Sequence, residues 1–230
     1  MPKIVDPQQR RRAVADAVHA VVARDGLEAA TLRNVADEAG LAVGSVRHYF
    51  TDHDELMIFA VQELGRRVGE RVWAHAERLL SESGGSREDR RRRTEELLAE
   101  FLPLDDVRRD EVLLRHTFTT AARTRPSLLT HAEAMQQTLH ELVHRTLQGA
   151  QASGGLPADF DVELESVRLR ALLDGLGLQA ALFPRRFPPD LLRAVLHRHL
   201  DSLVAAPRRG PGQIGRWPAR LIPPGTPTLD

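Results

Sequence analysis

The chain has 230 residues, of which 42% are hydrophobic and 28% are charged, an ordinary balance for a globular protein. Its 32 basic and 32 acidic residues give a formal net charge of 0, which excludes nucleic-acid binding driven by bulk positive charge. The absence of cysteine excludes disulfides and thiolate metal sites. No signal-peptide pattern and no run of 18 apolar residues occur, so we expect a cytoplasmic protein without a membrane span.

Helical periodicity runs through the first third of the chain. Residues 10–24 carry an apolar stripe at helical spacing, and Gly26 follows as a stop signal. Two short helices should follow, one from the N-cap Thr31 to Gly40 and one over residues 43–50. Asp52 with Glu55 three residues later predicts a capping box, which opens a long helix to about residue 80.

The rest of the chain also favours helices, because few segments alternate in the manner of strands. After the break "SESGGS", prolines and glycines delimit helices at 87–102, 104–124, 127–152, 161–183 and 188–204. Residues 205–230 are dense in proline and glycine and have no period, which predicts a tail without its own core. We therefore expect an all-α fold followed by this tail.

Residues 31–50 predict a helix-turn-helix, the second and third helices of a three-helix unit. Ala36 and Ala39 are small enough for the two helices to cross closely, and Gly40 supplies backbone freedom at the corner. The second helix of the pair should expose small and polar groups that fit a DNA major groove. These groups are Val43, Gly44, Ser45, Arg47, His48 and Tyr49.

The stretch "TLRNVADEAGLAVGSVRHYFTDHDEL" resembles the DNA-binding domain of the TetR family of bacterial transcriptional regulators. Matching positions are Thr31, Val35, Ala36, Ala39, Gly40, Leu41, Gly44, Val46, Tyr49 and Phe50. The resemblance implies a DNA-binding domain over residues 1–51, with further DNA contacts from Thr31, Arg33 and His53. Ala42 replaces the usual Ser or Thr cap, Arg47 replaces a Tyr that often contacts phosphate, and His53 replaces a phosphate-binding Lys.

Charge supports this assignment only locally. Residues 1–51 hold seven basic side chains (Lys3, Arg10, Arg11, Arg12, Arg24, Arg33 and Arg47) against six acidic ones (Asp6, Asp16, Asp25, Glu28, Asp37 and Glu38). Lys3 and Arg10–Arg12 either form a basic arm on DNA or are the solvated start of a helix, and the sequence leaves both open.

The second half, roughly residues 87–204, resembles the ligand-binding and dimer-forming domain of the BetI-like subgroup of the same family. The resemblance rests on "FLPLDDVRRDEV", "ARTRPSL" and "LLDGLGLQAALFPRRFPPDLL". It implies a homodimer, a small-molecule effector and a domain over residues 52–204. Candidate effector contacts are His75, Leu114, Thr117, Phe118, Met135 and Leu139, and candidate interface residues are Ala171, Gly175, Leu176, Leu192 and Val195. Some of these residues could instead serve an internal core.

Aromatic residues make up only 4% of the chain, so an aromatic cage for a quaternary ammonium such as choline is unsupported. We expect no cofactor.

One motif points elsewhere: His140-Glu141-Leu142-Val143-His144 is the H-E-x-x-H string of zinc peptidases. On a helical wheel the two histidines flank the apolar stripe, whereas Glu141 points to water. A third ligand would require Glu163 or Glu165 to fold back across a loop. We therefore expect neither a metal site nor an enzyme, and a zinc-dependent hydrolase stays the alternative from another class.

The sequence as a whole predicts a ligand-responsive transcriptional repressor that binds a near-palindromic double-stranded DNA operator as a homodimer. A small-molecule effector would release it. A constitutive DNA-binding dimer without an effector is a second alternative that the sequence leaves open.

Overall fold

The computed structural model describes residues 7–81 and 86–205, and in these ranges the regular structure is entirely helical. The predicted all-α fold is therefore confirmed. The helices are α1 (Pro7–Asp25), α2 (Leu32–Glu38), α3 (Val43–Tyr49), α4 (His53–Ser81), α5 (Arg87–Ala99), α6 (Asp106–Ala122), α7 (Pro126–Ala152), α8 (Val162–Leu182) and α9 (Pro189–Ala205), with a 3-10 turn η1 (Leu27–Ala29) that the sequence did not reveal. Lys3 and, apart from Ala205, the predicted tail lie outside the described residues.

The helix starts follow the predicted capping chemistry, with one shift. The Thr31 hydroxyl accepts the N–H of Asn34 at 3.2 Å, and the Asp52 carboxylate accepts the N–H of Glu55 at 2.8 Å. The Glu55 carboxylate, however, accepts from the backbone N–H and the hydroxyl of Thr51, both at 2.8 Å, rather than from Asp52. These bonds hold the pKa of Glu55 below its usual value, because they favour the charged form. The predicted capping box thus reaches one residue further back than expected.

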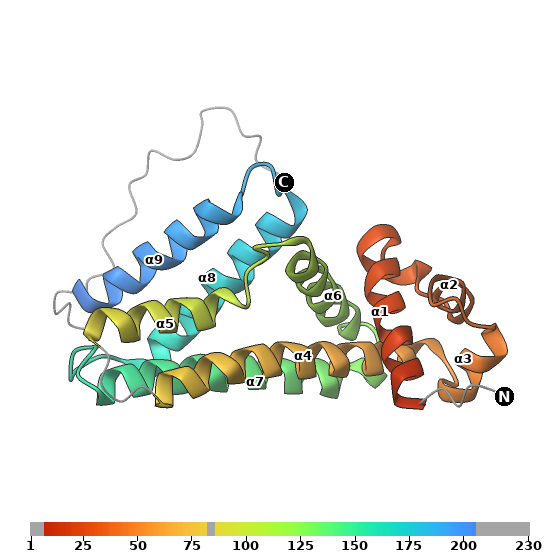
Figure 1. Cartoon of the computed structure of the whole chain (residues 1–230), viewed down its shortest axis with the longest axis horizontal. Coiled ribbons are helices and arrows are strands. Elements are labelled where there is room, and N and C mark those ends of the chain that lie inside the picture. Colours follow the sequence, from red (N-terminus) through yellow and green to blue (C-terminus); the bar gives the residue numbers. More distant parts are fainter. Residues whose placement is uncertain (1–6, 82–85, 206–230) are drawn as a thin grey trace, which may run out of the picture.

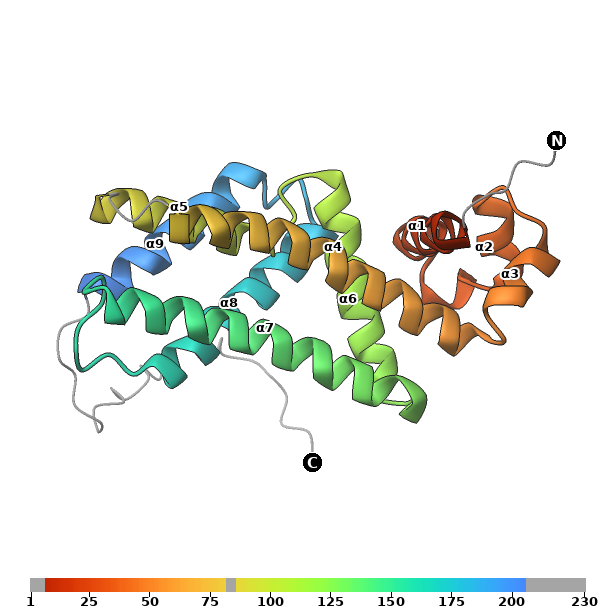
Figure 2. The same ribbon diagram turned by 60° about the horizontal axis from the view of Figure 1, so that its bottom comes forward.

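The long helix α4 connects the two ends of the molecule. Helices α1, α2 and α3 lie at one end, and α5, α8 and α9 lie toward the other (Figures 1 and 2). Both α4 and α7 extend from the junction with α1–α3 toward the far end, and α6 crosses between them (Figure 2). No helix within the described ranges is long and apolar enough to cross a lipid bilayer.

The hydrophobic packing does not stop at the domain boundary predicted after residue 51. One core joins α1–α3 to the first half of α4 and to buried residues of α6 and α7. For example, Leu56 and Met57 of α4 belong to the same fully buried cluster as Val46 of α3. A second core is built mainly from α5, α7, α8 and α9. Because packed cores transmit strain, a displacement of α4 or α6 would also displace residues of the helix-turn-helix.

Candidate DNA-binding face and ligand cavity

The corner between α2 and α3 has the geometry of a helix-turn-helix. Gly40 has a φ of 65°, a left-handed backbone conformation that residues other than glycine rarely adopt. The N–H of Leu41 donates to the carbonyl of Ala36 at 2.9 Å, which closes the turn. Ala36, Val46 and Phe50 are fully buried beneath it, so the two helices are held in a fixed relation.

This packing leaves one side of α3 open to solvent. Gly44, Arg47 and His48 are exposed, and Val43, Ser45 and Tyr49 are half-buried. Arg33 on α2 and the capping residue Thr31 are exposed as well. Arg33 and Arg47 make no ion pair with any residue that the structure describes, so their guanidinium groups are available for phosphates or guanine edges.

Arg11, for which the sequence leaves a DNA contact open, and His53, expected to contact phosphate, both contact other parts of the protein. The guanidinium of Arg11 lies over the rings of Phe50 and Phe59, 5.5 and 4.6 Å from their centroids. The half-buried His53 places Nε2 3.4 Å from the carbonyl oxygen of Leu27 and Nδ1 3.1 Å from Nη1 of Arg125. Arg11 is thus part of the packing at the start of α1, and the placement of His53 does not support the expected phosphate contact.

Arg125, the residue before α7, links the second half of the chain to η1 and to the start of α4. Its guanidinium donates to Glu28 of η1 at 2.9 Å and to Asp54 of α4 at 3.4 Å. The hydroxyl of Ser127 also donates to Asp54, and this bond is the main reason that the pKa of Asp54 lies below its usual value. We call Glu28, His53, Asp54, Arg125 and Ser127 the α7 junction.

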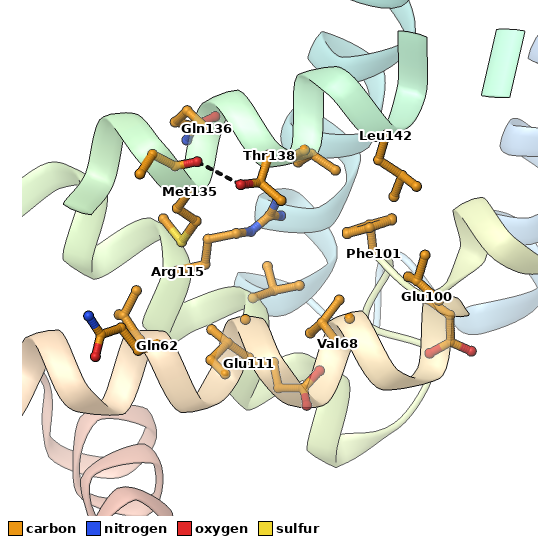
Figure 3. A pocket seen from close by; sticks show the side chains of 18 of the residues that line it. Gln62, Val68, Glu100, Phe101, Glu111, Arg115, Met135, Gln136, Thr138 and Leu142 are labelled. Atoms are coloured by element: carbon orange, nitrogen blue, oxygen red, sulfur yellow. Dashed lines mark hydrogen bonds between the residues drawn. The ribbon is translucent and has the colours of Figure 1, made fainter. Parts of the chain in front are cut away.

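Helices α4, α6 and α7, with Glu100 and Phe101 after α5, line an open cavity of about 560 Å³, within the range of small-molecule sites (Figure 3). Its wall is mostly apolar and includes the predicted effector contacts Met135 and Leu139. The other apolar lining residues are Val61, Leu64, Val68, Val72, Phe101, Val112, Ala134 and Leu142.

The other four predicted effector contacts lie outside this wall. Leu114 and Phe118 are fully buried in the first core, where α6 packs against α1. Thr117 is half-buried on the same helix, and His75 on α4 is bound to Glu100 at 3.2 Å. The prediction chose the most apolar face of α6, but that face forms the protein core. The adjoining face of α6 contributes Arg108, Glu111, Val112 and Arg115 to the cavity wall.

The two carboxylates of the cavity wall are already neutralised. Arg71 donates to Glu100 at 2.8 Å and to both oxygens of Glu111 at 2.6 and 3.0 Å. Arg108 adds a bond to Glu100 at 3.3 Å. Figure 3 shows both carboxylates directed away from the middle of the cavity. They therefore bind α4, α5 and α6 together rather than facing a ligand.

Two glycines of α4 that the sequence analysis passed over also line the cavity. Gly65 and Gly69 lie one turn apart, and a Cβ atom built on either one has no heavy atom within 4 Å. Glycine within a helix lowers the stability of that helix. Two glycines that face open space therefore suggest that the cavity must stay free of side chains at these positions. Their spacing of four residues inside a predicted helix was the signal that could have revealed them.

The H-E-x-x-H string lies on α7, and of its residues Leu142 lines the cavity, whereas His140, Glu141 and His144 do not. His140 and His144 place Nε2 3.6 and 3.8 Å from the carboxylate of Glu163, so that residue does fold back from α8. Glu141 points elsewhere: it is exposed, accepts from Gln137 at 3.1 Å and lies 3.8 Å from Arg145. Within residues 7–81 and 86–205, no group of three or more His, Cys, Asp or Glu is arranged to hold a metal ion.

The predicted interface residues of α8 and α9 fall into different environments. Ala171 and Gly175 are exposed, and Leu176 and Val195 are half-buried. Leu192 is fully buried in the second core, so it packs within the protomer and the prediction of an interface role was wrong. The same two helices and the loop between them expose large apolar side chains that the prediction missed, each at least 39% exposed: Leu164, Val167, Leu182, Phe183, Leu191 and Val204.

A helix-turn-helix with an open second helix, packed through one core onto a helical domain with a cavity, defines a DNA-binding transcriptional regulator. Residues 15–58 match the family described as bacterial regulatory proteins, tetR family, and residues 90–205 match the one described as BetI-type transcriptional repressor, C-terminal. The chain belongs to the TetR family of transcriptional regulators.

Relatives support this membership over nearly the whole chain. The HTH-type transcriptional regulator PksA of Bacillus subtilis (strain 168) is 31% identical over 209 residues, which cover 91% of this chain and 97% of PksA. The regulator BetI of Paraburkholderia phymatum is 26% identical and is covered to 98%, against 89% of this chain. These relatives are regulators and not enzymes, so the alternative of a zinc-dependent hydrolase is wrong.

Solved structures share the fold. A transcriptional regulator from Rhodococcus sp. superposes with a TM-score of 0.71 at 29% identity, over 85% of this chain and 96% of that one. A regulator from Saccharomonospora viridis in complex with choline gives a TM-score of 0.67 at 21% identity, over 84% and 96% of the two chains. At that identity the second likeness concerns the fold alone.

Proposed function

We propose that this regulator is a ligand-responsive repressor, which binds a near-palindromic operator as a homodimer in the cytoplasm and is released by a small molecule. The observation that carries the proposal is that one helix, α4, serves both sites. Its first turns pack in the core of the helix-turn-helix, and residues 61–72 line the cavity.

Two sets of contacts connect the cavity to the DNA-binding face. A molecule seated between α4 and α7 contacts Val61 and Leu64, which belong to the core that contains α3. It also contacts α7, whose start is bound through Arg125 to Glu28 and Asp54. A ligand that fits better when α4 and α7 are displaced would favour that state and change the position of α3.

A dimer follows from the demands of DNA recognition. One helix-turn-helix reads few base pairs, whereas two α3 helices set one helical turn apart read a near-palindrome. The exposed apolar side chains of α8 and α9 offer a surface that a second copy of the chain could cover. Ala171 and Gly175 on α8 would allow close approach there, since they carry little or no side chain.

A gel-shift assay with DNA from upstream of the protein's own gene tests the proposal. We expect a discrete complex that Arg47→Ala weakens by about 10- to 100-fold, the cost of losing one good base or phosphate contact. Arg145→Ala, which removes an arginine that is 79% exposed on α7, is the matched control and should change nothing. If no such DNA is bound and both variants behave alike on other DNA, the proposal fails.

The effector part can fail separately. Melting curves across a metabolite panel should show at least one compound that raises the melting temperature and releases the DNA. A constitutive DNA-binding dimer would bind the operator but respond to none of the compounds.

A further inference from the structure

We infer that the cavity accepts an anionic effector, an apolar molecule with a carboxylate head bound by Arg115. The inference rests on the proposed function, because it concerns the ligand of the same cavity. It adds the chemical class of that ligand, which neither the family membership nor the relatives supply.

Arg115 lines the cavity and has N–H groups that are free to donate hydrogen bonds to a ligand. Its side chain is only 12% exposed, and neither Nη1 nor Nη2 makes a hydrogen bond of good geometry with a residue that the structure describes. The nearest carboxylate oxygen is Oδ1 of Asp174 on α8, at 3.0 Å from Nη1. In Figure 3 the guanidinium extends from α6 toward Thr138 on the α7 side of the cavity.

The charge around Arg115 is unbalanced. Arg170 on α8 lies 3.6 Å from the same carboxylate of Asp174 and donates to the side-chain oxygen of Gln136. Two guanidinium groups, 12% and 21% exposed, therefore share a single carboxylate. Burial lowers the pKa of Arg115, which reflects the cost of holding its charge there. A carboxylate head would offset that cost and supply the missing hydrogen-bond acceptors.

The rest of the wall specifies an apolar body. Leu64, Val68, Met135 and Leu139 line the space beyond Arg115, and Gly65 and Gly69 keep it open. The wall disfavours a cationic ligand. Glu100 and Glu111 are bound to Arg71 and directed away from the middle, and Phe101 is the single Phe, Tyr or Trp among the described lining residues. An aromatic cage for a quaternary ammonium needs more than one such ring.

Calorimetric titration of the full-length protein tests this with three ligands that share one chain: decanoate, decan-1-ol and decyltrimethylammonium. We expect decanoate to bind about 10- to 100-fold more tightly than decanol, the range for a charge-assisted hydrogen bond in a buried site. The cation should bind no better than decanol. Arg115→Gln should abolish the preference for decanoate, whereas Arg109→Gln, on the same helix outside the cavity wall, should keep it.

Gly65→Phe provides a variant that leaves every charge in place. Its ring would occupy open space in the cavity, so it should block decanoate even if Arg115→Gln fails to fold. Equal binding of decanol and decanoate, a preference for the cation, unaltered binding by the Gly65→Phe variant, or no decanoate binding at all would each overturn the inference. Gel shifts with the same preparations separate the outcomes. If decanol releases the protein from DNA as well as decanoate does, the proposed function stands and only the anionic ligand is rejected.

Discussion

Replacing the two cavity-lining glycines of α4 by alanine should stabilise the protein. Glycine in a helix interior costs about 1 kcal/mol relative to alanine, because it loses more backbone freedom on folding. At Gly65 and Gly69 an added Cβ meets no heavy atom within 4 Å, so no clash offsets the gain. The double variant should therefore gain about 2 kcal/mol, equivalent to a rise in melting temperature of roughly 4–8 °C for a chain of this size.

Thermal melting followed by circular dichroism, together with urea unfolding, measures this gain. Gly40→Ala is the matched control, since its Cβ position is equally open but its φ of 65° disfavours a side chain. That variant should lose about 1 kcal/mol or more. An unchanged or lower melting temperature for the α4 double variant would refute the reasoning, because it would mean that another group closely approaches these glycines.

Three further predictions follow from other contacts. Arg125→Ala removes the centre of the α7 junction, so the effect of decanoate on operator affinity should fall at least about 5-fold. Anisotropy titrations with and without decanoate measure this effect, and an undiminished effect would exclude coupling through Arg125. Bonds from Arg66 and Arg67 lower the pKa of Glu63 from 4.5 to about 2, so its stabilisation is complete above pH 4.5 and is lost as the pH falls toward 2. In unfolding experiments Glu63→Gln should cost about 3 kcal/mol at pH 7, and a cost that persisted at pH 2 would contradict this. Val167→Asp places a charge on the exposed face of α8, which should yield monomers in light scattering and weaken operator binding; an intact dimer would place the interface elsewhere.

Much of the fold was predictable because local signals agree with tertiary structure. Thr31 and Asp52 are side chains that cap helices, and both do so here. Gly40 marks the corner of the helix-turn-helix, where its positive φ is required. These features depend on residues close in sequence, so periodicity and capping chemistry were sufficient to locate them.

The cavity was harder to predict, because it depends on which face of each helix meets which neighbour. On α6 the apolar face of Leu114 and Phe118 packs into the core, and the adjoining face, which carries charged residues, lines the cavity. Similarly, Leu192 looks like an interface residue on an amphipathic helix until the packing beneath α9 is known. His53 matched a phosphate-binding position of the family, but its partner Arg125 lies 72 residues away, beyond any local pattern.

Footprinting of the operator tests the central claim, that paired α3 helices read DNA under the control of the cavity. The account predicts two protected patches, centred about 10 base pairs or a multiple of that apart, which disappear together when decanoate is added. Arg47→Ala should remove both patches, and Gly65→Phe should keep them in the presence of decanoate. A single patch, or protection that every compound bound in the cavity leaves unchanged in the wild-type protein, would contradict the account.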